Sequence, residues 1–311
     1  MTTLLLLVPV NWSPLWAVPL SEFDSTLKLP VHGRDEYAPE DIEYVLSFRP
    51  PPGLLATLPN LKGVFSLGAG VDGFMSDPDY PKRVPLLRFG SKALTNEVAQ
   101  YVVFHTLLHH RQQREFDEYQ KKHEWRQRMP NRRTAETRIG ILGLGEIGQL
   151  AAERLRDLGF AVAGWSQTRK NIPSVESFTH DELKVFLART DILICLLPLT
   201  PETKSILNAE LFVSLPLGAY VINAARGAHL VEADLIAALN ARHLSGASLD
   251  VFEQEPLPPD NPLWSQPGVT VTPHVAGLTD PREAARSVLD GIAKLERGEK
   301  LENAVDFAKG Y

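Results

Sequence analysis

The chain has 311 residues, of which 44% are hydrophobic and 23% are charged, and its formal net charge at pH 7 is −6. This length exceeds one ordinary core and this composition is typical of a soluble globular protein, so we expect two domains. The negative charge and the lack of a basic stripe argue against a nucleic-acid partner.

The sequence also argues against a membrane partner and a signal peptide. The apolar segment Leu4–Val8 has no basic residue before it, and Pro9 ends it early. No segment reaches the length of a membrane span. A single cysteine, Cys195, excludes a framework of internal disulfides and fits a reducing compartment. We therefore expect a cytoplasmic protein in which Cys195 is a buried residue of a strand.

Short apolar runs alternate with mixed segments in the first hundred residues. The mixed segments contain Pro and Asp and have amphipathic patterns that suit turns and helices. Such alternation favours a parallel sheet with crossover helices. The predicted strands are Leu4–Val10, Tyr44–Phe48, Gly63–Leu67 and Pro85–Phe89.

Within Asn96–Lys122 a long helix is predicted to start at Asn96, because apolar residues recur at helical spacing with His105 on the same face. His109 interrupts this stripe, and we interpret it as part of a helix face rather than as a metal ligand. The charged segment Arg111–Arg133 that follows has weak periodicity. It is expected to link domains or to pack on a second subunit.

Strands and helices alternate again from Arg138 to Thr272, which is the rhythm of a doubly wound nucleotide-binding sheet. A final helix is predicted at Glu283–Glu296. The strands are expected at Arg138–Leu142, Ala161–Trp165, Ile192–Leu197, Ala219–Asn223, Gly246–Asp250 and Val269–Thr272. The helices between them are expected at Gly148–Leu158, Asp181–Ala188, Asn208–Val213 and Glu232–Ala241.

Three glycines connect the first strand of this block to the next helix. Gly143 permits a tight turn, Gly145 lets the backbone approach a pyrophosphate, and Gly148 lets the helix pack on the strand. The helix N-terminus offers unpaired amides and a positive dipole end to the phosphates. The pattern predicts dinucleotide binding, and a merely structural glycine turn is the alternative. The expected contacts are Gly143, Leu144, Gly145, Glu146, Ile147 and Gly148.

The next strand ends without the acidic residue that usually binds the ribose 2′-hydroxyl of NAD. No carboxylate lies between Leu158 and Val175. Hydroxyl groups and an amide beside two cations suit a 2′-phosphate, so we expect NADPH (NADP) to be preferred, with NADH as a second coenzyme. A solvated charged turn is the alternative. The residues expected at the coenzyme here are Trp165, Ser166, Gln167, Thr168 and Arg169.

Three polar residues whose side chains could take part in catalysis follow the predicted strands of this block. Arg226 lies in Asn223-Ala-Ala-Arg-Gly and His274 in Thr272-Pro-His-Val-Ala. Glu255 closes the segment Asp250-Val-Phe-Glu-Gln-Glu. Open α/β sheets bind ligands beyond the carboxyl ends of their strands, so these side chains are candidates for one site. Each of them alone also fits a surface or structural role.

In this order, the glycine loop, Arg226, Glu255 and His274 resemble the D-isomer-specific 2-hydroxyacid dehydrogenase family, over nearly the whole chain. The resemblance is closest to the glyoxylate/hydroxypyruvate reductase branch. Gln167 is a departure, because relatives of that branch often carry a second arginine there. The other motifs that carry the resemblance are Leu67–Asp72, Trp165–Lys170, Leu197–Thr203, Leu249–Phe252, Glu255–Pro259 and the terminal Gly310–Tyr311.

The resemblance implies two Rossmann-like, doubly wound α/β domains with parallel sheets and an active-site cleft between them. Residues 1–100 with 281–311 would form the substrate (catalytic) domain, and residues 101–280 the dinucleotide-binding domain. A homodimer is implied, for which the helix from Asn96 is the expected contact element. No metal is expected, since no spacing of His, Asp and Glu supports zinc and hydride transfer needs none.

Reduction of a 2-keto acid needs a group that holds the substrate and a group that donates a proton. Arg226 suits the first task, because a guanidinium can bind the carboxylate through two contacts and polarise the carbonyl. His274 is the expected general acid. The carboxylate of Glu255 would favour the protonated imidazolium and fix the ring. These three are the expected catalytic residues.

The remaining contacts follow from the resemblance. The backbone around Ala69, Gly70 and Val71 resembles the family's carboxylate-binding loop, and Arg226 and His274 complete the expected substrate site. Arg49 is a weaker substrate-side candidate, with an exposed arginine as the alternative. The additional residues expected at the coenzyme are Leu197, Pro198, Thr203, Ala224, Ala225, Arg226, Asp250, His274 and Ala276.

The combined expectation is an NADPH-preferring enzyme that reduces small 2-keto acids, such as glyoxylate or hydroxypyruvate, to 2-hydroxy acids. A dinucleotide-sensing binding protein without turnover is one alternative, since the corepressors that share this fold retain the same three residues. A different enzyme on the same scaffold is the second, either a dehydrogenase of another 2-hydroxy acid, such as phosphoglycerate dehydrogenase, or a formate dehydrogenase. A turnover assay distinguishes the expected reductase from a binding protein. A panel of 2-keto acids distinguishes it from a dehydrogenase with another substrate.

Overall fold

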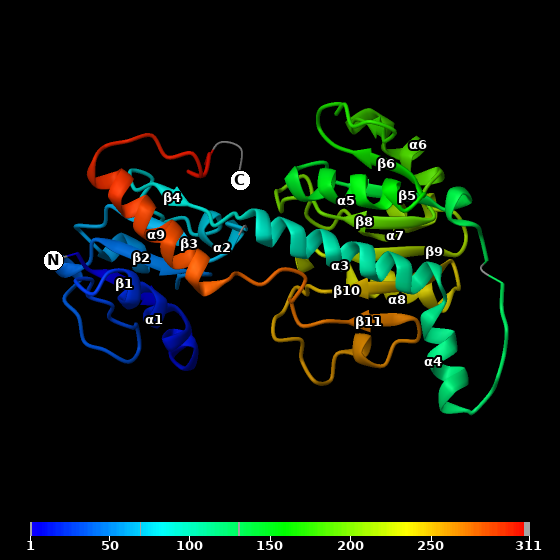
Figure 1. The fold of residues 1–311 in the computed structure, drawn as a ribbon, viewed down its shortest axis with the longest axis horizontal. Helices are drawn as coiled ribbons and strands as arrows, with labels where there is room; N and C mark the ends of the chain where they lie inside the picture. Colours follow the sequence, from blue (N-terminus) through cyan, green and yellow to red (C-terminus); the bar gives the residue numbers. More distant parts are fainter. Residues whose placement is uncertain (1, 69, 130, 308–311) are drawn as a thin grey trace. The chain divides into compact units, whose positions relative to one another are not determined.

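The computed structural model describes residues 2–68, 70–129 and 131–307, and the chain divides into two compact units (Figure 1). The first unit comprises Met1–Leu94 and Thr279–Tyr311, and the second comprises Thr95–Leu278. Each unit is built on its own parallel sheet with helices, so the predicted α/β class is confirmed.

The first unit contains a four-stranded sheet in the order β1-β2-β3-β4, with every neighbouring pair parallel. Its strands are continuous apolar runs because both faces are covered: Leu4 and Leu6 lie in one core cluster, and Leu5 and Leu7 lie in the other. Helices α1 and α9 pack on each other beside this sheet. The elements are β1 (Leu4–Leu7), α1 (Ser13–Phe23), β2 (Tyr44–Ser47), β3 (Gly63–Ser66), α2 (Asp72–Met75), β4 (Leu86–Leu87) and α9 (Pro281–Glu296).

The second unit contains a seven-stranded parallel sheet in the order β11-β10-β9-β8-β5-β6-β7. Its strands are β5 (Arg138–Leu142), β6 (Ala161–Trp165), β7 (Glu176–Phe178), β8 (Ile192–Cys195), β9 (Ala219–Asn223), β10 (Leu244–Leu249) and β11 (Val269–Val271). The strand order reverses between β5 and β8, and a crevice at this switch point is where open α/β sheets bind ligands.

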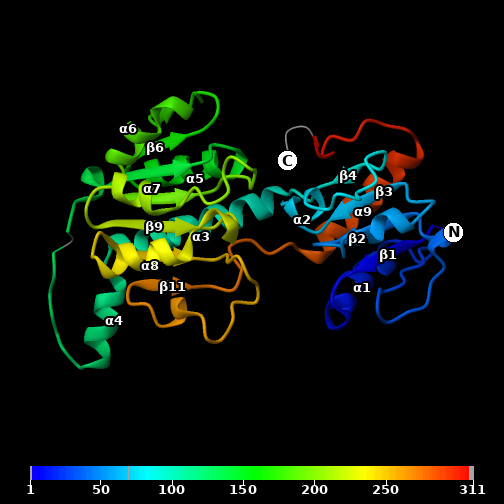
Figure 2. The same cartoon turned by 180° about the vertical axis from the view of Figure 1, so that it is seen from behind.

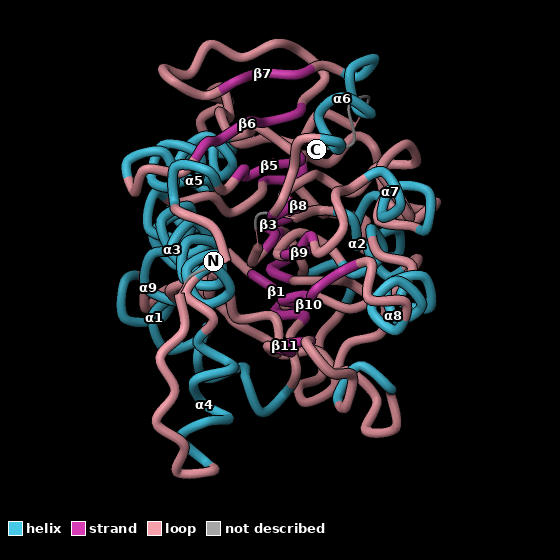
Figure 3. Tube along the Cα trace, turned by 90° about the vertical axis from the view of Figure 1, so that its right-hand side faces the viewer, coloured by secondary structure: helices cyan, strands magenta, loops and turns pink. Residues whose placement is uncertain are grey.

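Helices cover both faces of this second sheet. Figure 1 shows α3 in front of the sheet, and Figure 2, from behind, shows α7 and α8 in front. In Figure 3, α3 and α5 lie on one side of the strands, and α7 and α8 on the other. The helices are α3 (Lys92–His110), α4 (Gln113–Lys121), α5 (Glu146–Asp157), α6 (Leu183–Ala188), α7 (Ala209–Ser214) and α8 (Glu232–Asn240).

The long helix predicted to start at Asn96 is present as α3, but its start differs. The helix begins earlier, at Lys92, where Ser91 Oγ accepts a hydrogen bond from the Leu94 amide. It ends at His110, and a second helix starts at Gln113 after Gln112, whose left-handed φ is 56°. The break lies just beyond the point where the apolar periodicity weakens.

Two histidines of α3 pack on the second sheet. His109 stacks on Tyr220 with ring centroids 3.9 Å apart, and burial lowers the pKa of His109 to about 4. His105 Nδ1 lies 2.7 Å from Ser248 Oγ in the sheet below. Within the described residues there is no cluster of His, Cys, Asp and Glu that could hold a metal ion.

Cys195 is fully buried in β8, as predicted, and burial raises the pKa of its thiol to about 12. No helix of the described ranges is long and apolar enough to cross a membrane. The cytoplasmic location stays a prediction.

Candidate active site

The loop between β5 and α5 has the backbone that its glycines predict. Gly143 has a φ of +101°, and a Cβ there would lie 2.8 Å from the carbonyl oxygen of Leu196. A Cβ on Gly148 would lie 1.9 Å from the Gly143 oxygen, so only glycine allows this close approach of helix and loop. A Cβ on Gly145, by contrast, would meet no described atom within 4 Å. The backbone at Gly145 is therefore open to a ligand.

Gly145 is also the N-cap of α5, a helix of 12 residues. Among the described residues, no side chain caps this helix end. The first amides of the helix are thus left to a ligand or to water, with the positive end of the helix dipole behind them. Leu144, Glu146 and Ile147 complete the loop and the first turn. A dinucleotide pyrophosphate fits this donor set.

The segment after β6 ends in a tethered arginine. Arg169 donates from Nη2 to Glu182 Oε2 at 2.7 Å and from Nη1 to the carbonyl oxygen of Ser177. The same carboxylate oxygen accepts hydrogen bonds from the amide and the hydroxyl of Thr179. The Thr179 amide and then Arg169 lower the pKa of Glu182 to about 2, so this pair stays charged at neutral pH.

The neighbouring residues close this turn. Ser166 Oγ donates to the carbonyl oxygen of Thr168 at 2.8 Å. Trp165 is buried at the end of β6, and Gln167 is exposed. The described structure has no carboxylate on the 166–170 segment itself, as the sequence shows.

The loop after β8 carries the predicted residues Leu197, Pro198 and Thr203. Thr203 Oγ1 donates to the Pro198 oxygen at 2.7 Å and accepts from the Thr200 amide at 2.8 Å. Leu197 is buried in the core on the α6–α8 side of the sheet. These bonds fix the loop at the switch point, beside the glycine loop.

Arg226 follows β9 in a loop that the fully buried Asn223 holds. Asn223 Nδ2 donates to the Arg226 oxygen at 3.0 Å, and its Oδ1 accepts from the Ala225 amide at 3.2 Å. Arg226 Nη1 donates to the carbonyl oxygen of Ala225 at 2.7 Å. A Cβ on Gly227 would lie 1.8 Å from the carbonyl carbon of Phe252, so glycine is required where this loop meets the segment after β10. Ala224 precedes the buried Ala225.

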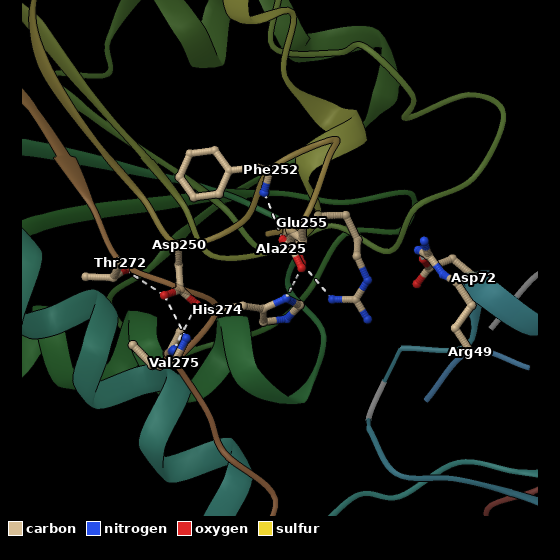
Figure 4. Close-up of polar contacts among 11 residues, drawn as sticks. Arg49, Asp72, Ala225, Asp250, Phe252, Glu255, Thr272, His274 and Val275 are labelled. Carbon is tan, nitrogen blue, oxygen red and sulfur yellow. Dashed lines mark hydrogen bonds and ion pairs between the residues drawn. The ribbon is translucent and has the colours of Figure 1, made fainter. Parts of the chain in front are cut away.

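His274 and Glu255 face each other (Figure 4). His274 Nδ1 lies 2.8 Å from Glu255 Oε2, and Glu255 Oε1 accepts from the Phe252 amide at 2.9 Å. Burial raises the pKa of Glu255, but the hydrogen bonds from His274 and Phe252 and the charge of Arg226 outweigh it and hold the pKa below its usual value. The carboxylate is therefore ionised, which assigns the proton of Nδ1 to this contact and leaves Nε2 for a ligand.

The loop that carries His274 is held by Asp250, which is 1% exposed. Asp250 Oδ1 accepts from Thr272 Oγ1 at 2.6 Å and from the Val275 amide at 2.9 Å, and Oδ2 accepts from the Ala276 amide at 2.8 Å. The His274 amide donates to the Asp250 carbonyl oxygen at 2.8 Å. These bonds secure the left-handed backbone of His274, whose φ is 55°. Sequence reasoning assigned Asp250 to the coenzyme and missed this structural task.

Of the residues predicted at the substrate, Arg49, Gly70 and Val71 belong to the first unit, and Arg226 and His274 to the second. Gly70 and Val71 immediately precede α2, and Ser66 Oγ donates to the Gly70 oxygen at 3.2 Å. Arg49 is largely exposed, and its Nη2 lies 3.7 Å from Asp72 Oδ2. Ala69 lies outside the described residues. The predicted cleft between the units, and the participation of these residues in it, stay predictions.

A glycine loop and an open helix N-terminus at the switch point of a doubly wound sheet define a dinucleotide-binding α/β protein. Comparisons with known proteins specify the family. Residues 103–276 match the family model described as D-isomer specific 2-hydroxyacid dehydrogenase, NAD binding domain. The chain belongs to the D-isomer-specific 2-hydroxyacid dehydrogenase family, whose members are NAD(P)-dependent enzymes.

Solved structures of proteins from this family match the whole length of this chain. A D-isomer specific 2-hydroxyacid dehydrogenase of Xanthobacter autotrophicus Py2, crystallised with NADPH and MES, is 41% identical, with a TM-score of 0.91 over 100% of this chain and 99% of that chain. An NADPH-dependent glyoxylate/hydroxypyruvate reductase of Sinorhizobium meliloti, with NADP and sulfate, is 39% identical, with a TM-score of 0.91 over 100% of both chains. A probable 2-hydroxyacid dehydrogenase of Rhizobium etli CFN 42, with NADP, is 38% identical, with a TM-score of 0.90 over 100% of both chains.

Proposed function

We propose that the chain is an NADPH-preferring reductase of small 2-keto acids, with glyoxylate and hydroxypyruvate as its substrates. The observation that carries this proposal is the end of β6, where Arg169 stands and the usual ribose-binding carboxylate is missing. The name of the Sinorhizobium meliloti relative supports the same coenzyme and the same substrates. Turnover of a panel of 2-keto acids with NADPH and with NADH tests both parts.

The coenzyme would be held by residues that fit it. The open backbone at Gly145 and the amides of α5 suit the pyrophosphate, and Arg169 suits the 2′-phosphate. When bound, the reduced nicotinamide supplies the hydride. Arg226 holds the substrate carboxylate and polarises its carbonyl, while His274 Nε2 donates a proton to the oxygen that gains negative charge. Glu255, hydrogen-bonded to Nδ1, orients the ring and stabilises its protonated form.

A homodimer belongs to the same proposal. Phe104 on α3 is 59% exposed, and Trp125 and Met129 in the segment after α4 are 92% and 86% exposed. Large apolar side chains that stay in water are typical of a surface that another subunit covers. Light scattering of the purified chain tests the dimer.

The Arg169→Ala variant tests the coenzyme preference. Loss of one exposed charged contact should weaken NADPH binding about tenfold. NADH binding should change little, because NADH has no 2′-phosphate. Added salt should also narrow the gap between the coenzymes in the wild-type enzyme, since salt screens the phosphate contact. Fluorescence titration with each coenzyme measures these affinities.

A matched control is Arg156→Ala at the end of α5. Arg156, like Arg169, contacts one carboxylate and one carbonyl oxygen, those of Asp157 and Pro173. Its loss should leave both coenzyme affinities unchanged. Equal losses for NADPH and NADH in Arg169→Ala would assign that arginine a structural role. A wild-type preference for NADH would contradict the proposed coenzyme.

The pH dependence of reduction tests the pairing of Glu255 with His274. Reduction needs protonated His274, so the rate falls at high pH as the imidazolium is lost. The Glu255→Gln variant removes the anion that stabilises the imidazolium, so the fall should move to lower pH. Steady-state rates across the pH range measure the shift. Glu253→Gln, an exposed neighbour, should leave the profile in place, and an unchanged profile for Glu255→Gln would mean that the two residues do not communicate.

A further inference from the structure

A fully buried histidine lies next to Arg226 and has no part in the proposed chemistry. His229 ends the short 3-10 helix Gly227–His229 and is 0% exposed. The amide of Arg226 donates to His229 Nδ1 at 3.3 Å. On the other side of the ring, Nε2 lies 3.2 Å from the carbonyl oxygen of Pro198. The imidazole thus connects the loop after β9 with the loop after β8.

These two contacts define the state of the ring. The Arg226 amide is a donor, so Nδ1 must be an unprotonated acceptor. The Pro198 oxygen is an acceptor, so Nε2 must carry the hydrogen. The neutral Nε2–H tautomer satisfies both partners, whereas an imidazolium would turn a second N–H toward the Arg226 amide. A buried ring with both nitrogens paired in this way has one orientation.

Each of the two loops that His229 connects is also held by a second hydrogen bond. The Pro198 oxygen also accepts from Thr203 Oγ1, and the Arg226 oxygen accepts from Asn223 Nδ2. The backbone of Arg226 is therefore held at both its carbonyl group and its amide, the latter by the His229 ring. Removal of the ring would leave a buried amide without its acceptor and would release the two loops from each other.

We propose that His229 is a positioning residue, which fixes the backbone of Arg226 against the loop after β8. The ring thereby couples the placement of the substrate-binding arginine to the placement of a coenzyme loop. This inference rests on the proposed function, because it takes Arg226 as the substrate ligand and Pro198 as part of the coenzyme site.

Two conservative substitutions separate the two contacts. An asparagine amide reaches the position of Nδ1, so His229→Asn can still accept from the Arg226 amide but cannot reach Pro198. A glutamine amide reaches the position of Nε2, so His229→Gln can still donate to Pro198 but leaves the Arg226 amide unpaired. Loss of one buried hydrogen bond should cost about tenfold in the affinity that it supports.

The expected results differ between the variants. His229→Gln should raise the KM for glyoxylate about tenfold and lower kcat, with NADPH affinity within about threefold of wild type. His229→Asn should instead weaken NADPH binding, measured by fluorescence titration, and keep the KM for glyoxylate near the wild-type value. His243→Gln is the matched control, because His243 Nε2 also contacts a carbonyl oxygen, that of Phe212 at 2.8 Å. A glutamine there keeps this contact by the same reasoning, so KM, kcat and NADPH affinity should all stay at their wild-type values.

The wild-type protein supplies a test that requires no variant to fold. NMR of protein with ¹⁵N-labelled histidine should show His229 as the neutral Nε2–H tautomer. An Nδ1–H tautomer or an imidazolium at neutral pH would overturn the inference. The same holds if both His229 variants lower Tm without changing KM, kcat or NADPH affinity, or if they share one kinetic profile.

The failure of this inference can be told from the failure of the proposed function. A wild-type enzyme that reduces no 2-keto acid, or an Arg226→Lys variant with wild-type kinetics, would overturn the proposed function. An impaired Arg226→Lys variant beside a His229→Gln variant with wild-type KM and kcat would overturn the role of His229 alone.

Discussion

The His274→Ala variant should lower the turnover number for glyoxylate by roughly 10²–10⁴-fold, which is the usual contribution of a general acid. The physical reason is the position of Nε2. Because Nδ1 is engaged by the ionised Glu255 at 2.8 Å, Nε2 is the ring atom left to protonate the substrate oxygen. Binding of NADPH should change much less, since the loss concerns the proton and not the coenzyme. Steady-state kinetics and a coenzyme titration measure the two quantities.

A second variant separates lost chemistry from lost structure. His274 has a left-handed φ of 55°, so alanine introduces backbone strain that Asn tolerates better. His274→Asn should therefore keep a Tm closer to wild type and lose turnover to a similar extent, because an amide is no proton donor of matching acidity. Near-normal turnover in either variant would remove His274 from the mechanism.

The strands of the fold were predictable because local pattern and tertiary structure agree there. A strand such as Ile192–Cys195 is covered on both faces, so its residues must all be apolar, and the sequence shows this directly. The strand Glu176–Phe178 was missed, because three residues at a sheet edge carry too little pattern. The weakening of the apolar periodicity beyond His109 lies close to the break at Gln112, but the left-handed conformation of that single residue has no sequence pattern of its own.

The candidate site also contains residues that could be predicted from the sequence and residues that could not. The glycine loop has a recognisable sequence because each glycine answers a local steric demand. The order of Arg226, Glu255 and His274 was recognised through the family resemblance. His229 and the structural task of Asp250 depend on contacts between loops that are distant in sequence, such as the 3.2 Å contact of His229 with the Pro198 oxygen. The spacing of residues along the chain does not encode such contacts.

The hydrogen bonds of Arg169 are a further example of contacts that the sequence did not predict. Sequence reasoning placed Arg169 beside a 2′-phosphate, and the structure adds its pairing with Glu182, 13 residues further along. A guanidinium has five N–H donors, and the two contacts found here engage its Nη atoms. Contact with a phosphate would therefore use the remaining donors or exchange one of the present partners. Titration of Arg169→Ala with NADPH measures the contribution of this side chain to coenzyme affinity.

The Arg226→Lys variant should lose about 10²-fold in kcat/KM for glyoxylate, although it preserves the positive charge. A planar guanidinium can bind a carboxylate through two parallel hydrogen bonds while another donor polarises the carbonyl, whereas an ammonium is a point charge. Arg226 is also preorganised, since its Nη1 donates to the Ala225 oxygen at 2.7 Å, and a lysine would not reproduce that geometry. We expect KM to rise and kcat to fall together, because substrate and transition state both use the contact.

Chemical rescue sharpens this prediction. In Arg226→Ala, added guanidinium should restore part of the activity, while ammonium at equal ionic strength should restore none, because only the former is a planar donor. Arg83→Lys, an exposed change in the other unit, should leave the kinetics at wild type. Wild-type kinetics from Arg226→Lys, or equal rescue by both cations, would mean that Arg226 contributes charge alone and that the two-pronged contact does not exist. Asn223, Gly227 and His229 hold one short segment of the loop after β9. This fixed backbone favours the two-pronged contact, and therefore an impaired Arg226→Lys variant and rescue by guanidinium alone.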